Sequence, residues 1–433
     1  MLKQFLIILL IAFTVPACKT STGIFGKKTL HDQYADKLSS AGLSQTAAGR
    51  SWFDAANKAI NQPLSITVPY RETGYFDANH PLATGYKFTA RRGEKLVISV
   101  TKKPLTGFAL FLDLWQPVIN NSSRFVLSAD SLLTLEYEVK EDASYILRLQ
   151  PELLAGGEYT LTIRIQPSLA YPIPAAAKPR LVSVWGMDRD AGARKHEGID
   201  IAAAKRTPLL ACADGTITSV RENNLGGKVI FLRPHGRDYS LYYAHLDEQL
   251  VQEGQRVQTG DTIGLVGNTG NAKFTGPHLH FGIYTNGGAI DPLPFVDKNK
   301  PEPAAISAGI TLLNKYVRAG KNTLLLVSPD KKAVKLLMLQ NSTLLQVLAA
   351  TASWYKVQLP DGMTGFVPAA NVSTAEKRFI NYNVTTEKSL LDKPDTMAAS
   401  KATISKGNKL DVLGIWNGYY FVSHAGNTGW VMP

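Results

Sequence analysis

The stretch Gly276-Pro277-His278-Leu279-His280-Phe281 carries two histidines two residues apart among alternating apolar side chains. Side chains two apart on a β-strand point to the same face, so the pattern predicts a strand on which His278 and His280 project side by side. Upstream, His196-Glu197-Gly198-Ile199-Asp200 places a carboxylate four residues after another imidazole, and Tyr243-Ala244-His245 lies between the two motifs. These motifs hold four of the eight histidines, so the region between residues 196 and 281 is where we expect the chemistry of this chain.

The composition is that of a globular chain with several domains. A length of 433 residues favours about two to four domains, and a hydrophobic content of 45% is enough for packed cores. The formal net charge of +12 suits an acidic partner such as nucleic acid, anionic lipid or an anionic wall polymer. Because the lysines and arginines are scattered and form no block, we expect a mildly cationic surface and no nucleic-acid site.

The N-terminus has the pattern of a secretory signal. A short basic start, Met1-Leu2-Lys3, precedes an apolar run over residues 5–14 that is too short to span a bilayer. The following Val15-Pro16-Ala17-Cys18 resembles a bacterial lipobox, in which cleavage removes a signal peptide, residues 1–17, and Cys18 is acylated. This predicts a lipoprotein of the cell envelope, periplasmic or outer-membrane facing, that is held to a membrane by its N-terminal lipid anchor. An ordinary signal peptide cut nearby is the alternative. Lipidation of Cys18 would leave Cys212 as a buried thiol without a disulfide partner.

The rest of the chain predicts a mainly β, multidomain protein. Residues 18–62 are expected to form a tether and a helical segment, because apolar residues from Trp52 to Ile60 recur at helical spacing. Residues 63–168 predict a β-sandwich, because apolar residues alternate, as in Tyr159-Thr160-Leu161-Thr162-Ile163, between turn signals. The proline-rich segment 171–179 predicts an extended spacer. Residues 180–297, rich in glycine and β-branched residues, predict a twisted all-β domain.

The C-terminal part follows a second linker at residues 298–303 and contains an internal repeat. Pro329-Asp330 recurs 65 residues later as Pro394-Asp395, and Gly365-Phe366-Val367 recurs as Gly429-Trp430-Val431. The two copies cover residues 305–373 and 378–433. Each consists of short predicted strands, and together they resemble the bacterial SH3-like barrels that often accompany cell-wall hydrolases.

The histidine motifs can supply the ligands of a hydrolytic zinc site. Such a site needs about three protein ligands and one open position for water, and His196, Asp200 and His280 offer two imidazoles and one carboxylate. Bound zinc lowers the pKa of its water to about 7 and polarises a scissile carbonyl. His278, on the strand face of His280, and His245, from a neighbouring strand, can relay the proton and steady the oxyanion. Each motif alone is weak evidence, because a His-x-His strand is more often structural than a pair of ligands.

Taken together and in order, these motifs resemble the lysostaphin-type, or LytM-type, peptidoglycan metallopeptidases. The resemblance runs from about Gly186 to Pro292 and rests on His196-Glu197-Gly198-Ile199-Asp200-Ile201, Ala213-Asp214-Gly215-Thr216-Ile217, Tyr243-Ala244-His245-Leu246, Gly267-Asn268-Thr269-Gly270 and Thr275-Gly276-Pro277-His278-Leu279-His280-Phe281. It implies an antiparallel β domain with a peptide groove, in which His196, Asp200 and His280 bind Zn²⁺ and His245 and His278 are catalytic. The implied activity is hydrolysis of peptide bonds in peptidoglycan stems or cross-links.

Two departures from the family pattern leave these ligands in place. Gly282 stands where many members have glutamate, and the charged segment 188–195 is expected to shape or cover the groove. The competing hypotheses are a non-catalytic wall-binding or amidase-activating protein on the same fold, and a metallopeptidase that acts on ordinary proteins. The intact ligand set favours the zinc endopeptidase, with peptidoglycan as its partner, and leaves open which bond is cut.

Overall fold

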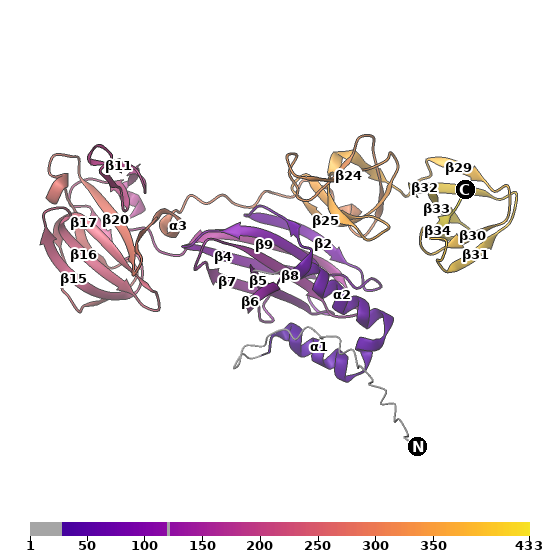
Figure 1. Cartoon of the computed structure of the whole chain (residues 1–433), viewed down its shortest axis with the longest axis horizontal. Helices are drawn as coiled ribbons and strands as arrows, with labels where there is room; N and C mark the ends of the chain where they lie inside the picture. The colour runs from indigo at the N-terminus through magenta and orange to yellow at the C-terminus, as the bar shows by residue number, and fades with distance from the viewer. Residues whose placement is uncertain (1–27, 119–121) are drawn as a thin grey trace, which may run out of the picture.

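A computed structural model describes residues 28–118 and 122–433, and the chain is mainly β as predicted (Figure 1). The predicted signal peptide and Cys18 lie outside the described residues. Along the long axis of Figure 1, a β domain from the middle of the chain lies at one end, and the C-terminal strands lie at the other. Within the described ranges, no helix has both the length and the apolar character needed to cross a membrane.

Two helices precede the first sheet, and both fall in the segment predicted to be helical. Helix α1 (Leu30–Ser40) begins at a capping box, in which the Thr29 hydroxyl accepts from the Asp32 backbone N–H and the Asp32 carboxylate accepts from that of Thr29. Helix α2 (Ala47–Asn61) carries Trp52, which is fully buried. His31 of α1 stacks on the Trp52 ring with 4.8 Å between centroids, so the two helices pack through these side chains.

A β-sandwich follows, and its two sheets share one apolar core. Its strands are β1 (Leu64–Ser65), β2 (Tyr70–Phe76), β3 (Thr84–Ala90), β4 (Glu94–Lys103), β5 (Leu110–Val118), β6 (Ser122–Ser128), β7 (Thr134–Glu138), β8 (Ala143–Pro151) and β9 (Gly157–Pro167). One sheet has the order β1-β3-β8-β5-β6, and the other contains β2-β9-β4-β7. The alternation seen in the sequence puts every second residue of β4, such as Leu96 and Ile98, into the core.

The central β domain is built on one large, mostly antiparallel sheet. Its strands are β10 (Arg180–Ser183), β13 (Ile199–Ala202), β14 (Pro208–Leu210), β15 (Gly215–Asn223), β16 (Gly227–Pro234), β17 (Tyr239–Gln249), β18 (Arg256–Val257), β19 (Thr262–Val266), β20 (His278–Thr285) and β21 (Gly288–Ile290). The order β10-β13-β20-β17-β16-β15-β18 places β20 between β13 and β17. A short hairpin of β11 (Asp188–Arg189) and β12 (Arg194–Lys195) precedes β13, and α3 (Leu293–Val296) ends the domain.

The prediction of an extended spacer at residues 171–179 is wrong. Ile173 is buried in the core of the central domain, and Leu169, just before the segment, is buried there too. The Pro172 carbonyl accepts a hydrogen bond from the Leu210 N–H at 2.8 Å. A 3-10 helix (Ala175–Ala177) follows Pro174, and the burial of Ile173 stabilises the packed segment more than an exposed spacer allows.

The C-terminal strands form two groups. Those of the first repeat are β22 (Tyr316–Ala319), β23 (Leu324–Leu326), β24 (Lys335–Met338), β25 (Leu344–Thr351), β26 (Trp354–Gln358), β27 (Thr364–Pro368) and β28 (Val372–Thr374). Those of the second are β29 (Ile380–Asn383), β30 (Lys388–Leu391), β31 (Ser400–Ile404), β32 (Lys409–Trp416), β33 (Tyr419–His424) and β34 (Asn427–Val431).

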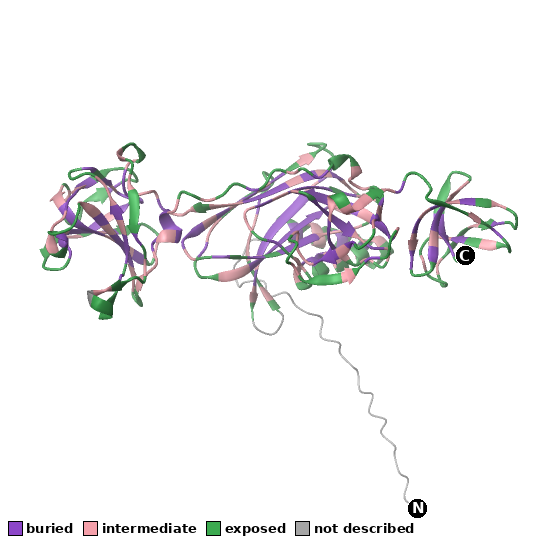
Figure 2. Cartoon of the chain, turned by 90° about the horizontal axis from the view of Figure 1, so that it is seen from above, coloured by how far each residue is buried: buried purple, intermediate pink, exposed green. Residues whose placement is uncertain are grey.

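The first repeat is not separate from the sandwich. Strand β25 pairs antiparallel with β2, with Thr73 opposite Ala350 and Gly74 opposite Ala349, so one sheet runs through both. The second repeat keeps its own sheet of six strands. Figure 2 shows buried residues concentrated along the strands of each group.

Candidate metal centre

Three residues from adjacent segments meet at one end of strands β13 and β20. Asp200 on β13 lies directly opposite His280 on β20 in the antiparallel register. His196 comes from the turn between β12 and β13, and its backbone N–H donates to the Met187 carbonyl at 2.8 Å. Asp200 therefore lies on a strand reached from a loop, and no helix presents it beside His196.

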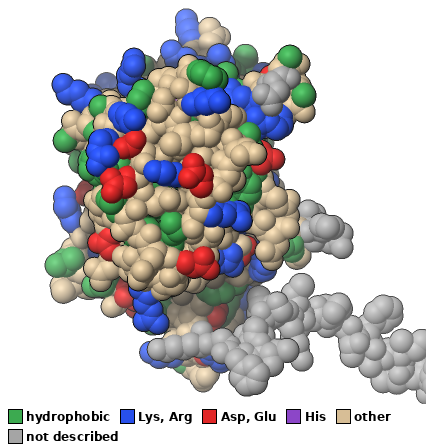
Figure 3. All heavy atoms as spheres, turned by 90° about the vertical axis from the view of Figure 1, so that its left-hand side faces the viewer, with side chains coloured by type: hydrophobic (Ala, Val, Ile, Leu, Met, Phe, Trp, Pro, Cys, Tyr) green, Lys and Arg blue, Asp and Glu red, His purple; other side chains and the backbone are tan. Residues whose placement is uncertain are grey.

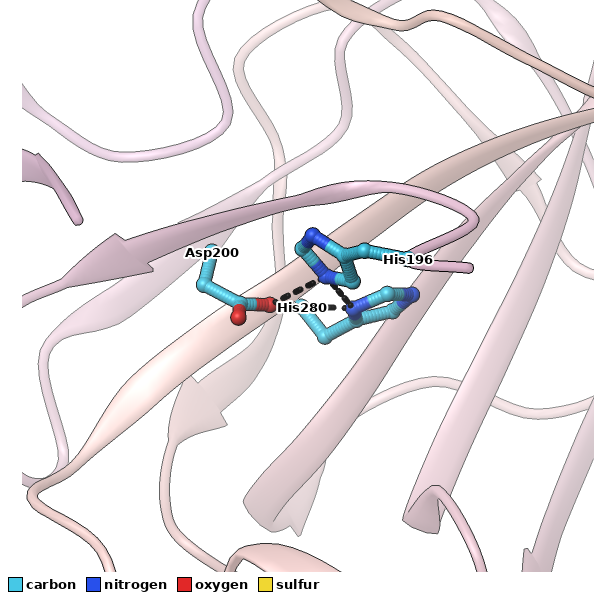
Figure 4. Close-up of side chains that lie close together, drawn as sticks. All are labelled: His196, Asp200 and His280. Carbon is cyan, nitrogen blue, oxygen red and sulfur yellow. Dashed lines mark hydrogen bonds and ion pairs between the residues drawn. The ribbon is translucent and has the colours of Figure 1, made fainter. Parts of the chain in front are cut away.

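Their side-chain atoms form a close triangle (Figure 4). The distances from His196 Nε2 to Asp200 Oδ1, from His196 Nε2 to His280 Nδ1, and from His280 Nδ1 to Asp200 Oδ1 are each 3.0 Å. Ligand atoms around a tetrahedral zinc lie about 3.3 Å apart, so a few tenths of an ångström of expansion would admit the ion. Two imidazoles and one carboxylate are one of the donor sets found in catalytic zinc sites. Three protein ligands leave a fourth position for water.

The hydrogen bonds at the back of His196 fix its tautomer. His196 Nδ1 lies 2.9 Å from the Val184 carbonyl, which can only accept, so Nδ1 carries the proton. The lone pair is then on Nε2, which faces Asp200 and His280. Orientation of a metal-binding histidine by a backbone carbonyl is a common feature of such sites.

The protonation states also suit a cation. Burial alone would raise the pKa of Asp200, but the adjacent imidazoles of His196 and His280 outweigh burial and hold that pKa well below its usual range. Burial lowers the pKa of His280. A metal needs a charged carboxylate and neutral imidazoles as ligands, and these two shifts favour that combination.

His245 and His278 stand beside the triangle, on β17 and at the start of β20. Their ring centroids are 5.0 Å apart, and the His245 centroid is 5.9 Å from that of His280. The Nδ1 of His245 donates to the Thr269 carbonyl at 2.9 Å and that of His278 to the Gly276 carbonyl at 2.8 Å, so both Nε2 atoms are free to accept. Burial, followed by the neighbouring His278 and His280, lowers the pKa of His245 to about 4.

All five predicted site residues line one groove with a volume of about 640 Å³. Tyr242 and Tyr284 line the groove as well, as do Glu197 and Arg194. An open groove of this size can take an extended peptide across the metal position. The end of the molecule that carries this domain shows interspersed basic and acidic side chains and no single-sign patch (Figure 3).

The sequence did not reveal two polar residues behind the triangle. Arg189, from the hairpin of β11 and β12, donates from Nη2 to Asp200 Oδ2 at 2.8 Å and to the Ser183 hydroxyl at 2.6 Å. The charged segment 188–195, expected to shape or cover the groove, thus contains a hairpin that contacts the Asp200 carboxylate. An arginine among other charged residues has no periodic signal, and only the pairing of β10 with β13 brings Ser183 beside Asp200.

Comparison with known proteins adds an independent line of evidence. The family model described as Peptidase family M23 matches residues 194–292. An uncharacterized metalloprotease of Haemophilus influenzae is 46% identical over 101 residues, which are 23% of this chain and 21% of that one. The peptidoglycan DD-endopeptidase ShyC of Vibrio cholerae is 39% identical over 94 residues, 22% of this chain and 21% of its own. The L-Ala–D-Glu endopeptidase of Bacillus subtilis is 35% identical over 138 residues, 29% of this chain and 42% of its own.

The chain thus spans between about a fifth and two fifths of the length of these relatives. The residues that the family model matches, 194–292, include the ligand triangle and the two further histidines. The resemblance to LytM-type metallopeptidases is supported over residues 194–292, the part of the chain that the model of peptidase family M23 matches.

Proposed function

We propose that the chain is a zinc metalloendopeptidase that hydrolyses peptide bonds in peptidoglycan stems or cross-links. The observation that carries the proposal is the triangle of His196 Nε2, Asp200 Oδ1 and His280 Nδ1, whose three lone-pair donors converge at 3.0 Å inside a peptide-sized groove. The names of the relatives support a cell-wall substrate. Because those two relatives are named for different bonds, they do not select the bond cut by this chain.

Zinc bound to His196, Asp200 and His280 would supply a Lewis acid and an acidified water. The other residues then have separate tasks. His245 and His278 each present an unprotonated Nε2 to the groove and can take a proton from the attacking water. The lowered pKa of His245 makes it a weaker base toward the water and, once protonated, a stronger acid toward the leaving amine. Protonated, either imidazole can also donate to the oxyanion.

The test uses the zinc-loaded chain with purified peptidoglycan, and the products are resolved by mass. His278→Ala should lower kcat by at least about 100-fold while bound zinc is retained, since a general acid–base group contributes on this scale. His235→Ala is the matched control, because His235 is an exposed histidine of the same domain that lies outside the groove lining. New peptide termini made by the unmutated chain would identify the bond.

Two results would contradict the proposal. If the zinc-loaded chain cuts no peptidoglycan, the non-catalytic wall-binding or amidase-activating alternative is favoured. If it cuts a glycine-rich protein but no muropeptide, the substrate is an ordinary protein. An equally active His278→Ala variant would remove that residue from the mechanism.

We also propose that Cys18 is acylated and holds the protein in the cell envelope, with the two C-terminal repeats as SH3-like modules that retain it on the wall. The support is the lipobox-like sequence before Cys18 and the repeated Gly-aromatic-Val sequence, which lies on β27 in the first repeat and on β34 in the second. Incorporation of labelled fatty acid into the chain, and its loss in Cys18→Ala, tests the anchor. Binding to purified peptidoglycan by chains with and without residues 305–433 tests the repeats.

A further inference from the structure

The two oxygens of the Asp200 carboxylate have different partners. Oδ1 faces His196 Nε2 and His280 Nδ1, both at 3.0 Å, whereas Oδ2 accepts from Arg189 Nη2 at 2.8 Å. The side chain of Asp200 is 13% exposed and that of Arg189 is 29% exposed, so this ion pair is partly shielded from water. A shielded, charge-assisted hydrogen bond constrains orientation more than one between exposed side chains does.

We propose that Arg189 is a positioning residue for the metal centre. Its guanidinium occupies Oδ2, so that Asp200 offers Oδ1 alone to the ion, and it fixes the plane of the carboxylate. The inference rests on the proposed zinc function, and it assigns a task to a residue of the hairpin rather than to the ligands themselves.

A second contact of Arg189, with Ser183, supports the role of this arginine in positioning the site. The same Nη2 donates to the Ser183 hydroxyl at 2.6 Å, and this hydroxyl lies 3.2 Å from His196 Nδ1. Ser183 is buried on β10, and its backbone lies opposite Asp200 in the strand register. Arg189 therefore connects the carboxylate ligand to the polar groups behind the imidazole ligand, as outer partners of metal ligands commonly do.

The same contacts tie the hairpin to the centre. Arg189 and Arg194 lie opposite each other in the β11–β12 register, and both line the groove. Without the contact between Arg189 and Asp200, both the hairpin that lines the groove and the Asp200 carboxylate would be less constrained. Loss of Arg189 is thus expected to weaken zinc binding and also to raise the KM for substrate.

The direction in which zinc affinity changes when Arg189 is replaced distinguishes two roles of Arg189: orienting Asp200, or acting only as a nearby positive charge. Arg189 is a cation near a cation site, so by charge alone its removal should tighten zinc binding. Loss of an orienting partner has the opposite effect and typically weakens metal affinity by about 10- to 100-fold. A weaker affinity therefore cannot be explained by the removal of a positive charge.

The experiment measures the zinc Kd of the full chain by competition with a chromophoric chelator, without substrate. Arg189→Met should raise the Kd by about 10-fold or more, and Arg189→Lys should recover part of the loss because it restores a donor. Lys195→Met is the matched control, since Lys195 is a cation of the same hairpin that pairs with Asp188 at the surface. Circular dichroism and the Tm check that each variant folds. KM and kcat on cross-linked muropeptides, at saturating zinc, complete the comparison.

A Kd for Arg189→Met that equals or falls below that of the unmutated chain would overturn the inference, as would an equal rise in Lys195→Met. If the unmutated chain binds zinc but cuts no peptidoglycan, the proposed function fails while the Kd comparison still decides the role of Arg189. If it binds no zinc at all, both fail.

Discussion

Lys356 provides the sharpest test of how the sandwich and the first C-terminal repeat are joined. It lies on β26 and is 3% exposed, and its ammonium contacts Glu72 of β2, which is fully buried. The distances from Lys356 Nζ are 3.4 Å to Glu72 Oε1, 2.8 Å to the Tyr86 hydroxyl and 3.3 Å to the Tyr159 hydroxyl. Every partner comes from the sandwich, so the ammonium bridges two predicted domains.

The expected cost of replacing Lys356 can be estimated from these distances. At 3.4 Å and an effective dielectric constant of about 20, the attraction between the two charges is about 5 kcal/mol. Removing one partner of a buried pair typically costs about 3–5 kcal/mol. Here the Glu72 carboxylate would stay buried with hydrogen bonds from the Tyr70, Tyr86 and Tyr159 hydroxyls but without a counter-ion, so we expect the lower end of that range. Lys356→Met should therefore lower the free energy of opening of the β2–β25 junction by about 3 kcal/mol. The double variant Lys356→Met/Glu72→Gln, which removes both charges, should recover most of the loss.

Native-state hydrogen exchange of the full chain is the suitable assay, because a chain of several domains does not unfold in one step. The amides to follow are those of β2 and β25, where Thr73 lies opposite Ala350. Lys58→Met is the control: Lys58 of α2 is exposed and donates to the Gly362 carbonyl of the first repeat at 3.2 Å, so it is a lysine contact to the same repeat without burial. Its replacement should cost less than about 1 kcal/mol. The reasoning is refuted if Lys356→Met costs no more than Lys58→Met, or if the double variant is no more stable than Lys356→Met.

Three further predictions concern other buried positions. Gly198→Ala should weaken zinc binding by about 10-fold or more in a chelator titration, because the new Cβ would lie 2.5 Å from the Phe281 carbonyl oxygen and 2.7 Å from His280 Cε1; an unchanged Kd would contradict the importance of this close packing. Burial, with the nearby Arg148, lowers the pKa of His31 to about 3, so the unfolded chain takes up a proton near pH 6.5 before the folded chain does. Native-state hydrogen exchange of the α1 and α2 amides should therefore give a free energy of opening about 2 kcal/mol lower at pH 5 than at pH 8, and this difference should shrink in His31→Gln; equal pH dependence in both chains would contradict it. Burial raises the pKa of the Cys212 thiol to about 12, so a thiol reagent at pH 8 should label Cys212 only after unfolding, and rapid labelling of the native chain would be inconsistent with that burial.

Much of the candidate site could be predicted from the sequence. The alternation around His278 and His280 gave their strand, and the residue types of His196, Asp200 and His280 pointed to a zinc donor set. The structure brings these residues together because β13 and β20 pair in a register that sets Asp200 opposite His280. The roles of His245 and His278 stay predictions until their variants are measured.

Other features could not be predicted because their partners are far apart in the chain. Glu72 and Lys356 are separated by 284 positions, and neither belongs to a motif. The segment 171–179 looked like a spacer because of its prolines, whereas its Ile173 is buried against strands that follow it in sequence.

The sequence by itself determined local geometry and chemical type: which segments alternate, which helix is capped, and which side chains can bind a metal. These properties depend on neighbours within a few residues. Only the tertiary structure decided that Arg189 reaches the second oxygen of Asp200 and that β25 extends the sheet of β2. Both depend on how strands pair, and pairing is settled by burial and hydrogen bonding between segments distant along the chain, which no local pattern records.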